Sequence, residues 1–496
     1  MSKTGGLAVR RATTRLEPDR SRVITQMFVP GQEGFDHQDS RTATVIARLL
    51  ALDDEEVGST LDQVVTDFGG RHRDLLATFE RHAAAVADRL APGCELSDER
   101  RLLLGATFTS EYAIEGAALC NPSMVAHPDQ SGVPGGSLRF VMSVRAVGEG
   151  HRSSIGFRTG TIDATGQASF DPPPRFAVAG ASRAVALDAA TFRSELHRLG
   201  SRGENADFVL DSLGTTFSPA DLDARLLELQ ANLTTRRHAE RTIEVIRAIA
   251  ERTYGVEFPA DTSFGERVLR PSMSAECHGM EDARFVRFTH DDGRVSHYAT
   301  YTAYDGFRIS QQLLETTDFS TFTSVPLVGD GAANKGIALF PRPVHGRFAA
   351  LSRWDRESNS VTFSDNLRRW PRAAPVQVPT RAWDVLQLGN CGSPIETDAG
   401  WLVLTHGVGP MRTYSIGALL LDLDDPTVVV SRLRQPLLEP ERDEQNGYVP
   451  NVVYSCGALV HADTLVLPYG IGDASIGIAT MAMSDLLAEL DQTREG

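Results

Sequence analysis

The stretch that decides the fold runs from His278 to Gly306 and reads HGMEDARFVRFTHDDGRVSHYATYTAYDG. Its two runs FVRFTH and VSHYATYTAY show the alternation of apolar and polar residues that is typical of β-strands. Asp-Asp-Gly stands between the runs, and Asp-Gly is a common turn signal. The stretch therefore predicts two strands joined by a turn, with a charged segment directly before the first strand.

Three charged side chains, Glu281, Asp282 and Arg284, form this segment. Neighbouring residues of a regular strand point to opposite faces, so only one of the two carboxylates can face a given pocket. Arg284 would share a face with Asp282 and lower the pKa of its carboxyl, whereas a general acid must hold its proton. The pattern alone leaves a structural salt bridge and a catalytic carboxylate both open.

Short strands with Asp-Gly, Gly or Pro between them continue along the chain from about residue 265 to 482. Such spacing predicts a β-sandwich, a barrel or a propeller. A rhythm of strand, turn and further strands favours the propeller, although no strict motif repeats. Residues 483–496 predict a short amphipathic helix at the C-terminal end.

Helical spacing of apolar residues appears in two other parts of the chain. Residues 1–105 read as a mostly helical N-terminal extension, with apolar residues at helical spacing in DSRTATVIARLLAL and RHRDLLATFERHAAAVADRL. Strands begin after it, but helical spacing returns at about 175–260, where Ser218-Pro219 marks a helix start. We therefore expect a β domain at 106–482 that is interrupted by a helical insertion.

The composition excludes several classes of protein. The 496 residues include 49 Lys and Arg against 65 Asp and Glu, and the net charge of -16 argues against nucleic-acid and membrane-surface binding. The start of the chain has no apolar signal core, and no apolar run of about 18 residues exists, so we expect a cytoplasmic protein. The five cysteines lie far apart without CxxC spacing, which predicts free thiols and no metal site.

Candidate anion-binding residues are scattered along the strands. Lys335 stands between a small-residue loop and an apolar strand, where it could hold a phosphate as a point charge or be a solvated loop residue. Isolated arginines could likewise bind an anion or be solvated surface residues. Other polar residues lie at strand ends, where β scaffolds tend to build sites. These further candidates are Arg145, Arg152, Arg308, His406 and Asp473.

Seven segments resemble, in order, the motifs of glycoside hydrolase family 130, the β-mannoside phosphorylases and related β-mannosidases. The segments are GMEDARF, YATYTAYDG, NKGIALFPRPVHGRF, GWLVLTHGV, GALLLDLDDP, PNVVYSCGAL and YGIGDASIGIA. The resemblance covers about 265 to 482, and it implies a mainly β fold, a five-bladed β-propeller with its site at the central channel. The helical N-terminal region and the helical insertion go beyond the family's core.

The resemblance also implies roles for individual residues. Asp282 takes the position of the family's general acid, which delivers its proton through a mannose hydroxyl, and Ala283 stands where many members have proline. An inverting hydrolase needs a second carboxylate roughly 6.5–9.5 Å away, whereas a phosphorylase needs cations to hold phosphate. The implied phosphate ligands are Lys335, Arg308, Arg145, Arg152, His406 and Tyr454. The implied sugar ligands are Asn121, Glu276, Asp473 and Tyr304.

The expected function is the reversible, inverting phosphorolysis of β-mannosides, with β-1,2-linked oligomannosides as substrates and α-mannose 1-phosphate as product. Inorganic phosphate is the co-substrate, and no other cofactor, metal, nucleic acid or membrane partner is expected. An inverting β-mannosidase and a non-catalytic carbohydrate-binding propeller stay open as alternatives. The N-terminal helices could extend the acceptor subsites, cover the channel or form a homo-oligomer interface.

Overall fold

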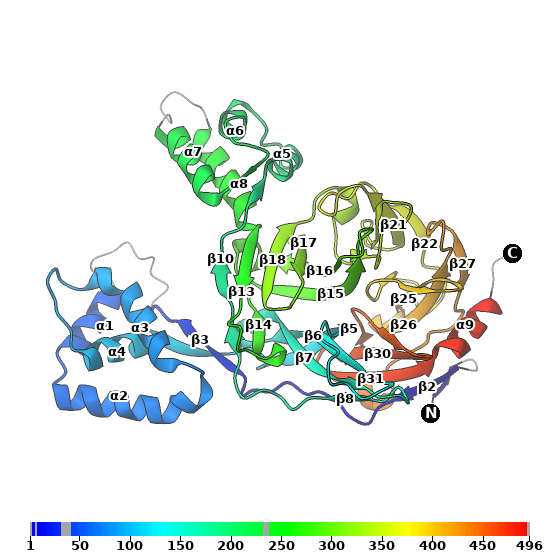
Figure 1. Cartoon of the computed structure of the whole chain (residues 1–496), viewed down its shortest axis with the longest axis horizontal. Coiled ribbons are helices and arrows are strands. Elements are labelled where there is room, and N and C mark those ends of the chain that lie inside the picture. Colours follow the sequence, from blue (N-terminus) through cyan, green and yellow to red (C-terminus); the bar gives the residue numbers. More distant parts are fainter. Residues whose placement is uncertain (1, 5–6, 31–40, 232–237, 494–496) are drawn as a thin grey trace. The chain divides into compact units, whose positions relative to one another are not determined.

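The computed structural model shows a mainly β chain that divides into two compact units (Figure 1). We call them the strand unit and the helical unit and describe each by itself. The described residues are 2–4, 7–30, 41–231 and 238–493. The strand unit comprises Met1–Pro18, Ala117–Pro173 and Ala179–Gly496, and the helical unit comprises Asp19–Gly116 and Pro174–Val178. Within the described part of the chain, no helix is both long and apolar enough to cross a membrane.

The helical unit packs four helices around a small apolar core. Aspartate or serine caps begin α2, α3 and α4: the Asp53 carboxylate, for example, accepts from Glu56 N at 2.8 Å. At Gly105 an added Cβ would lie 1.8 Å from the Phe79 carbonyl oxygen, so only glycine lets α3 and α4 approach this closely. Its elements are β3 (Val23–Met27), α1 (Arg41–Leu50), α2 (Asp54–Phe68), α3 (Leu75–Ala85), α4 (Asp98–Thr107) and β4 (Thr109–Ala113).

The start of the chain differs from the predicted helical extension. Strand β1 (Ser2–Thr4) pairs with β2 (Leu7–Arg11), and β2 pairs with β31 (Ser475–Ala482) in the strand unit. In β2 the side chains of Leu7 and Val9 are buried and those between and after them are not, which is the two-residue period of a strand. These residues therefore form an edge of the last sheet and not part of a helical region.

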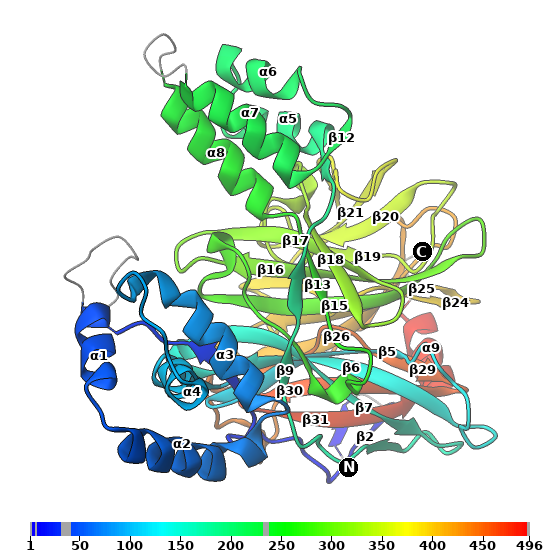
Figure 2. The same ribbon diagram turned by 60° about the vertical axis from the view of Figure 1, so that its left-hand side comes forward.

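The helical insertion lies inside the predicted range of 175–260 and has its own core (Figure 2). Buried leucine, valine and isoleucine side chains from all four helices form one cluster, in which Leu226 and Ile246 are fully buried. The flanking strands β10 (Ala181–Arg183) and β13 (Tyr254–Glu257) pair with each other and, through β13, with β18 (Thr321–Pro326). The helices are α5 (Ala189–Arg198), α6 (Glu204–Leu210), α7 (Pro219–Ala231) and α8 (Ala239–Glu251), with β11 (Leu187–Asp188) and β12 (Thr216–Phe217) between them.

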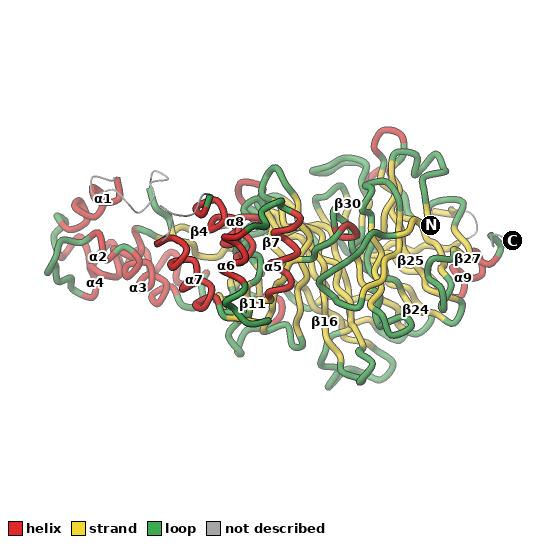
Figure 3. Tube along the Cα trace, turned by 90° about the horizontal axis from the view of Figure 1, so that it is seen from above, coloured by secondary structure: helices red, strands yellow, loops and turns green. Residues whose placement is uncertain are grey.

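The remaining strands, yellow in Figure 3, form a series of mainly antiparallel groups, with one parallel pairing between β15 and β7. A 12-stranded sheet contains β10 and β13 and the following strands: β5 (Ala118–Ala126), β6 (Leu138–Val147), β7 (Ser153–Ile162), β8 (Ala168–Phe170), β9 (Val178–Ala179), β14 (Arg267–Leu269), β15 (Gly279–Thr289), β16 (Val295–Tyr304), β17 (Ile309–Thr316) and β18 (Thr321–Pro326). Strands β15 and β16 pair antiparallel, as the opening stretch predicts.

Three smaller sheets follow along the chain. The first holds β19 (Ala338–Leu339), β20 (Phe348–Ser352), β21 (Asn359–Ser364) and β22 (Ala374–Gln377). The second holds β23 (Gln387–Asn390), β24 (Ile395–Thr397), β25 (Gly400–Val408), β26 (Tyr414–Leu421) and β27 (Val429–Arg432). The third joins β1 and β2 to β28 (Val453–Tyr454), β29 (Leu459–His461), β30 (Thr464–Ile471) and β31, and the helix α9 (Met483–Asp491) follows it.

Candidate active site

Polar and charged residues from several of these sheets meet around the start of β15. We call the set Arg145, Glu281, Asp282, Arg284 and Lys335 the charged cluster. Arg145 comes from β6, the next three residues from β15, and Lys335 from the loop before β19. Residues from two strands of the 12-stranded sheet and from a loop before the next sheet thus converge on one point.

A β-bulge sets the direction of both carboxylates. The pairing of β15 with β16 shifts between Glu281 and Arg284, and Asp282 has a left-handed backbone with φ of 56°. Arg145 lies 2.6 Å from the Glu281 carboxylate and 3.6 Å from that of Asp282. The prediction that only one of the two faces a given pocket is therefore wrong, because the bulge breaks the regular alternation of the strand.

A second bulge lies opposite, on β5. The pairing of β5 with β6 shifts between Cys120 and Ser123, and Asn121 has φ of 49°. The Asn121 side-chain amide donates to the Asp282 carboxylate, while its own Oδ1 is buried without a hydrogen-bond partner. Left-handed backbone at two facing polar residues is strain of the kind that collects at functional sites, and the orphaned oxygen can accept from a ligand.

Glu281 binds two of the cluster's cations at once. Its carboxylate accepts from Arg145 at 2.6 Å and from Lys335 Nζ at 2.6 Å. Its side chain is 8% exposed, whereas those of Arg145 and Lys335 are 22% and 33% exposed. Both cations therefore stay reachable from solvent while one anchored carboxylate fixes their positions.

Arg284 holds the backbone of the site and does not bind the Asp282 carboxylate directly. Its guanidinium donates to the Asp282 carbonyl oxygen at 2.9 Å and to the Tyr454 hydroxyl at 2.7 Å. A third bond, at 3.2 Å, goes to the Asn390 side-chain oxygen. Arg284 thus ties the bulge to β28 and β23, which fits the role of a scaffold residue.

Opposing influences set the proton affinity of Asp282. Burial raises its pKa, but the charges of Arg145, Lys335 and Arg284 and the hydrogen bond from Asn121 together hold the pKa below its ordinary value of 3.8. In contrast, burial raises the pKa of Asp473, on the β30–β31 turn, to about 6, against the lowering effect of Arg145. Without a ligand, Asp473 therefore holds a proton more readily than Asp282 does.

His406 on β25 is a neutral part of the same region. Burial, Arg353 and Arg284 lower its pKa well below 6.5. Its Nδ1 donates to the Asn390 carbonyl oxygen at 3.1 Å, and its Nε2 accepts from Arg353 at 3.2 Å. The His406 ring also packs against Tyr454 with centroids 4.9 Å apart, so these two predicted residues share one wall of the site.

The predicted phosphate ligands Arg152 and Arg308 lie elsewhere. Both side chains are exposed, on the β6–β7 and β16–β17 turns, and they line two cavities beside the helical insertion. Tyr304 lies between these places, because its ring is 6.0 Å from Lys335 Nζ and its hydroxyl donates to the Gly306 carbonyl oxygen at 2.7 Å. The structure therefore brings together Arg145, Lys335, His406 and Tyr454, but places Arg152 and Arg308 on turns outside the charged cluster.

Glu276, a predicted sugar ligand, is fully buried among protein groups. Its carboxylate accepts from the Tyr254 hydroxyl at 3.0 Å, from the Tyr301 hydroxyl, and from Ser272 N at 2.9 Å. Burial raises its pKa above 4.5, although these hydrogen bonds oppose the shift. Its contacts in the structure stabilise the loop before β15.

Sequence reasoning missed two residues of the region, Asn390 and Arg353, and it named Glu281 without predicting that it binds both cations. The sequence does contain one further signal for the charged cluster. The chain has only two lysines, Lys3 and Lys335, although Lys and Arg together number 49. Lysine and arginine are not interchangeable where a compact charge is needed. A lysine in so arginine-rich a chain points to a specific role for Lys335.

Comparison with known proteins identifies the family. The family profile described as beta-1,4-mannooligosaccharide phosphorylase matches residues 233–492, more than half of the chain. The chain belongs to glycoside hydrolase family 130. This places it among the glycoside phosphorylases, as the sequence analysis expects.

Two family 130 relatives show the extent of the similarity. The chain is 35% identical over 240 residues to the 1,2-beta-oligomannan phosphorylase of Thermoanaerobacter sp. (strain X514), covering 44% of this chain and 75% of that protein. It is 32% identical over 237 residues to the beta-1,2-mannobiose phosphorylase of Listeria innocua, covering 45% and 63%. A solved structure of a Listeria innocua beta-1,2-mannobiose phosphorylase with its disaccharide aligns at 21% identity and a TM-score of 0.43, over 77% of this chain and 93% of that one.

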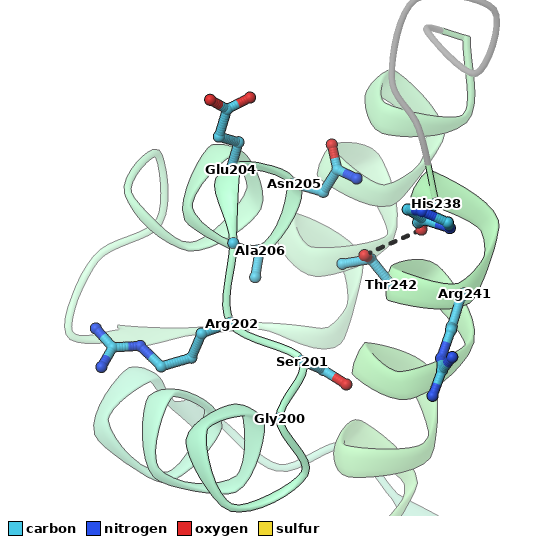
Figure 4. A pocket seen from close by; sticks show the side chains of 10 residues that line it. Gly200, Ser201, Arg202, Glu204, Asn205, Ala206, His238, Arg241 and Thr242 are labelled. Carbon is cyan, nitrogen blue, oxygen red and sulfur yellow. Dashed lines mark hydrogen bonds between the residues drawn. The ribbon is translucent and has the colours of Figure 1, made fainter.

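A separate cavity of about 920 Å³ lies within the helical insertion (Figure 4). Figure 4 shows Glu204 and Arg202 pointing away from one another, while the Thr242 hydroxyl donates to the His238 carbonyl oxygen at 3.2 Å. No residue of the charged cluster lines this cavity, so it is not part of the candidate active site.

Proposed function

We propose that this chain is an inverting β-mannoside phosphorylase that releases α-mannose 1-phosphate from β-1,2-linked oligomannosides, reversibly. The observation that carries the proposal is the pair of cations, Arg145 and Lys335, which Glu281 holds beside Asp282. Cations at an acid are what a phosphorylase needs to bind its anionic nucleophile. The names of the family 130 relatives support the substrate class and the β-1,2 linkage.

The charge balance of the site favours phosphate over water as the nucleophile. Beyond Arg145 and Lys335, Arg284 and Arg353 also reach the region, and Arg145 Nε and Arg353 Nε are buried without hydrogen-bond partners. A hydrolase would need a second carboxylate as a free base. Glu281 is bound by two cations, so its carboxylate is not free to act as that base.

Phosphate binding also explains how Asp282 acquires its proton. The cations that lower the pKa of Asp282 in the free chain are those that would bind phosphate. A phosphate dianion on Arg145 and Lys335 offsets their charge, so the pKa of Asp282 rises as the co-substrate arrives. A phosphate oxygen then forms the new bond at C1 of the mannose while the bond to the leaving oxygen breaks on the opposite face, and Asp282 supplies the leaving oxygen's proton through a mannose hydroxyl.

The same proposal includes a five-bladed propeller in the strand unit. The groups β5–β8, β15–β18, β19–β22, β23–β27 and β28–β31 follow one another along the chain and would be the five blades. The first and last groups are joined by hydrogen bonds from Cys456 N to the Pro122 carbonyl oxygen at 2.8 Å and from Met124 N to the Gly457 carbonyl oxygen at 3.2 Å. This junction supports a ring of blades with the charged cluster at its centre. Asn121 and Asp473 would bind the mannose hydroxyls there.

The scarcity of lysine permits a direct test of phosphate binding. With ¹³C-labelled lysine, the spectrum contains side-chain signals of only Lys3 and Lys335, and a Lys335→Arg variant assigns them. Titration with inorganic phosphate should shift the Lys335 signal and leave that of Lys3 in place, because the ammonium exchanges part of its contact with Glu281 for phosphate. Chloride at equal ionic strength is the control. Equal responses of both lysines, or none, would contradict the assignment of Lys335 as a phosphate ligand.

A further inference from the structure

Phe307 is the most exposed of the large apolar side chains in the described residues. Its side chain is 94% exposed, followed by Met411 at 85% and Leu227 at 61%. Folding gains nothing from a phenyl ring left in water, so packing does not explain this side chain. Phe307 lies at the tip of the turn between β16 and β17, which belongs to the edge where β15 begins.

The turn that carries Phe307 is held rigidly. The Asp305 carboxylate accepts from Phe307 N at 2.8 Å and from Arg308 N at 2.6 Å. The Tyr304 hydroxyl binds the Gly306 carbonyl oxygen at 2.7 Å, and Gly306 has φ of 96°, a conformation that favours glycine. The phenyl ring is therefore presented by a fixed backbone, which reduces the entropy lost when a ligand binds.

A short series of contacts joins this turn to the charged cluster. Lys335 Nζ lies 2.6 Å from the Glu281 carboxylate and 6.0 Å from the Tyr304 ring centre. Tyr304 pairs with Gly279 at the start of β15, three residues before Asp282. Phe307 thus stands at the rim of the candidate active site.

A cleft between this turn and the helical insertion continues from the rim. It has a volume of about 420 Å³ and is lined by residues of α5 and α8 as well as by the turn. An adjoining cavity of about 470 Å³ shares Glu251, Met273 and Ser274 with it and extends to Arg152. The polar residues that matter here are Arg198, Glu251, Ser274, Asp305 and Arg308.

The chemistry of the cleft suits a neutral, hydroxyl-rich ligand. Arg198 is already neutralised by Glu195 at 2.8 Å, and Glu251 accepts from the Ser274 hydroxyl at 3.0 Å. Asp305 stands beside Arg308, so charges of both signs are present without a clear excess. Phe307 does not itself line the cleft, but its turn neighbours Asp305 and Arg308 do. Apolar walls with a few polar groups, on a turn that also carries an exposed aromatic ring, match a pyranose ring with its apolar face and its hydroxyl edge.

We propose that Phe307 and this cleft form a subsite for the sugars beyond the cleaved bond, with Phe307 stacked on one pyranose ring. The inference rests on the proposed function, because phosphorolysis that removes a terminal mannose leaves all other sugars on the leaving-group side. The helical insertion then favours longer substrates, because the outer sugars of an oligomannoside bind in the cleft whereas the disaccharide is too short to reach it.

The test compares β-1,2-mannobiose and β-1,2-mannotetraose as substrates of the full chain. Phe307→Ala should lower kcat/KM for the tetraose by about five- to tenfold, as expected for loss of one aromatic contact, and leave the value for mannobiose within about twofold. Phe307→Trp should keep the tetraose rate, and Glu251→Ala should repeat the selective loss. Leu227→Ala is the matched control, since Leu227 is exposed on α7 and lines neither cavity.

Equal effects of Phe307→Ala on both substrates, or no effect on either, would overturn the subsite while the proposed function stands. Calorimetric titration of mannotetraose gives a second readout that does not depend on turnover. Weaker binding by Phe307→Ala supports the subsite even if phosphate has no influence on the reaction. Unchanged affinity contradicts it, whatever the nucleophile.

Discussion

At the scale of single residues, the charges around Asp282 decide its state more than burial does. Arg145, Lys335 and Arg284 keep its pKa below 3.8 despite a side chain that is only 12% exposed. A carboxylate with so low a pKa is deprotonated and cannot donate a proton. Its pKa rises only when another anion binds to the neighbouring cations. In the proposed reaction, phosphate binding to these cations would therefore raise the pKa of Asp282 and prepare it to donate its proton.

Asp473 yields a prediction about stability and pH. Its folded pKa of about 6 lies above the ordinary 3.8, so its contribution to stability is present below pH 3.8 and lost as pH rises through about 6. Asp473→Asn should therefore stabilise the protein at pH 8 relative to pH 4, by up to about 2 kcal/mol, given that the residue is partly exposed. Denaturant unfolding at the two pH values measures this.

The matched control is Asp443, an exposed residue whose pKa is lowered by its hydrogen bond to Arg15. Asp443→Asn should give no stabilisation at pH 8, because the folded state favours the charged form of this group. If Asp473→Asn stabilised equally at both pH values, Asp473 would not be the titrating group.

The sequence predicted the identity of the cluster better than its geometry. Asp282 and Lys335 stood in recognisable motifs, and the structure brings both to one place through Glu281. The direction of the carboxylates could not be predicted, because the left-handed backbone at Asp282 arises from a bulge that depends on the partner strand. Arg152 and Arg308 were predicted as phosphate ligands but lie outside the charged cluster, because the charge of a turn residue does not reveal where its side chain points.

At the scale of elements, the two bulges on β5 and β15 are the features that build the site. They place Asn121 against Asp282 and are tied together by the buried hydrogen bond from Phe285 N to the Ser123 hydroxyl at 3.0 Å. One bulge on each of two facing strands turns side chains toward a common centre, where regular strands would turn them aside.

The N-terminal strand β2 gives a prediction about stability. Leu7 is 6% exposed and belongs to the cluster that also contains Leu486 and Leu490 of α9. Leu7→Ala should lower the free energy of unfolding of the strand unit by about 2–5 kcal/mol, because it leaves a cavity in that core. Ala8→Ser is the control, since Ala8 is exposed on the opposite face of β2. Similar, small effects of both changes on denaturant unfolding would mean that β2 does not pack there.

The elements that local pattern specifies were predictable, and those that depend on distant pairing were not. The alternation in β15 and β16 and the helical spacing in α7 and α8 identify these elements from sequence alone. Strand β2 is only five residues long, and its partner β31 lies at the other end of the chain. A run this short carries too little periodicity to be separated from a helix end.

At the scale of the whole molecule, the strand unit contains both the charged cluster and the helical insertion, and the helical unit contains the N-terminal helices. The helical insertion contributes a wall to the cleft at the Phe307 turn, so the proposed subsite predicts that this chain prefers longer oligomannosides. The helical unit packs around its own core, and its role in covering the site or in oligomer formation stays a prediction.

The measurement that tests the central claim most directly is the dependence of bond cleavage on phosphate. Purified protein is incubated with β-1,2-mannobiose, with and without inorganic phosphate. Free mannose and mannose 1-phosphate are quantified, and the anomeric configuration of the mannose 1-phosphate is determined. We expect one α-mannose 1-phosphate for each bond cleaved, background turnover without phosphate, and loss of turnover by about 10²–10⁴-fold in Asp282→Asn. Release of free mannose at the same rate without phosphate would show a hydrolase and contradict the account. Binding of the sugar without any cleavage would contradict it as well.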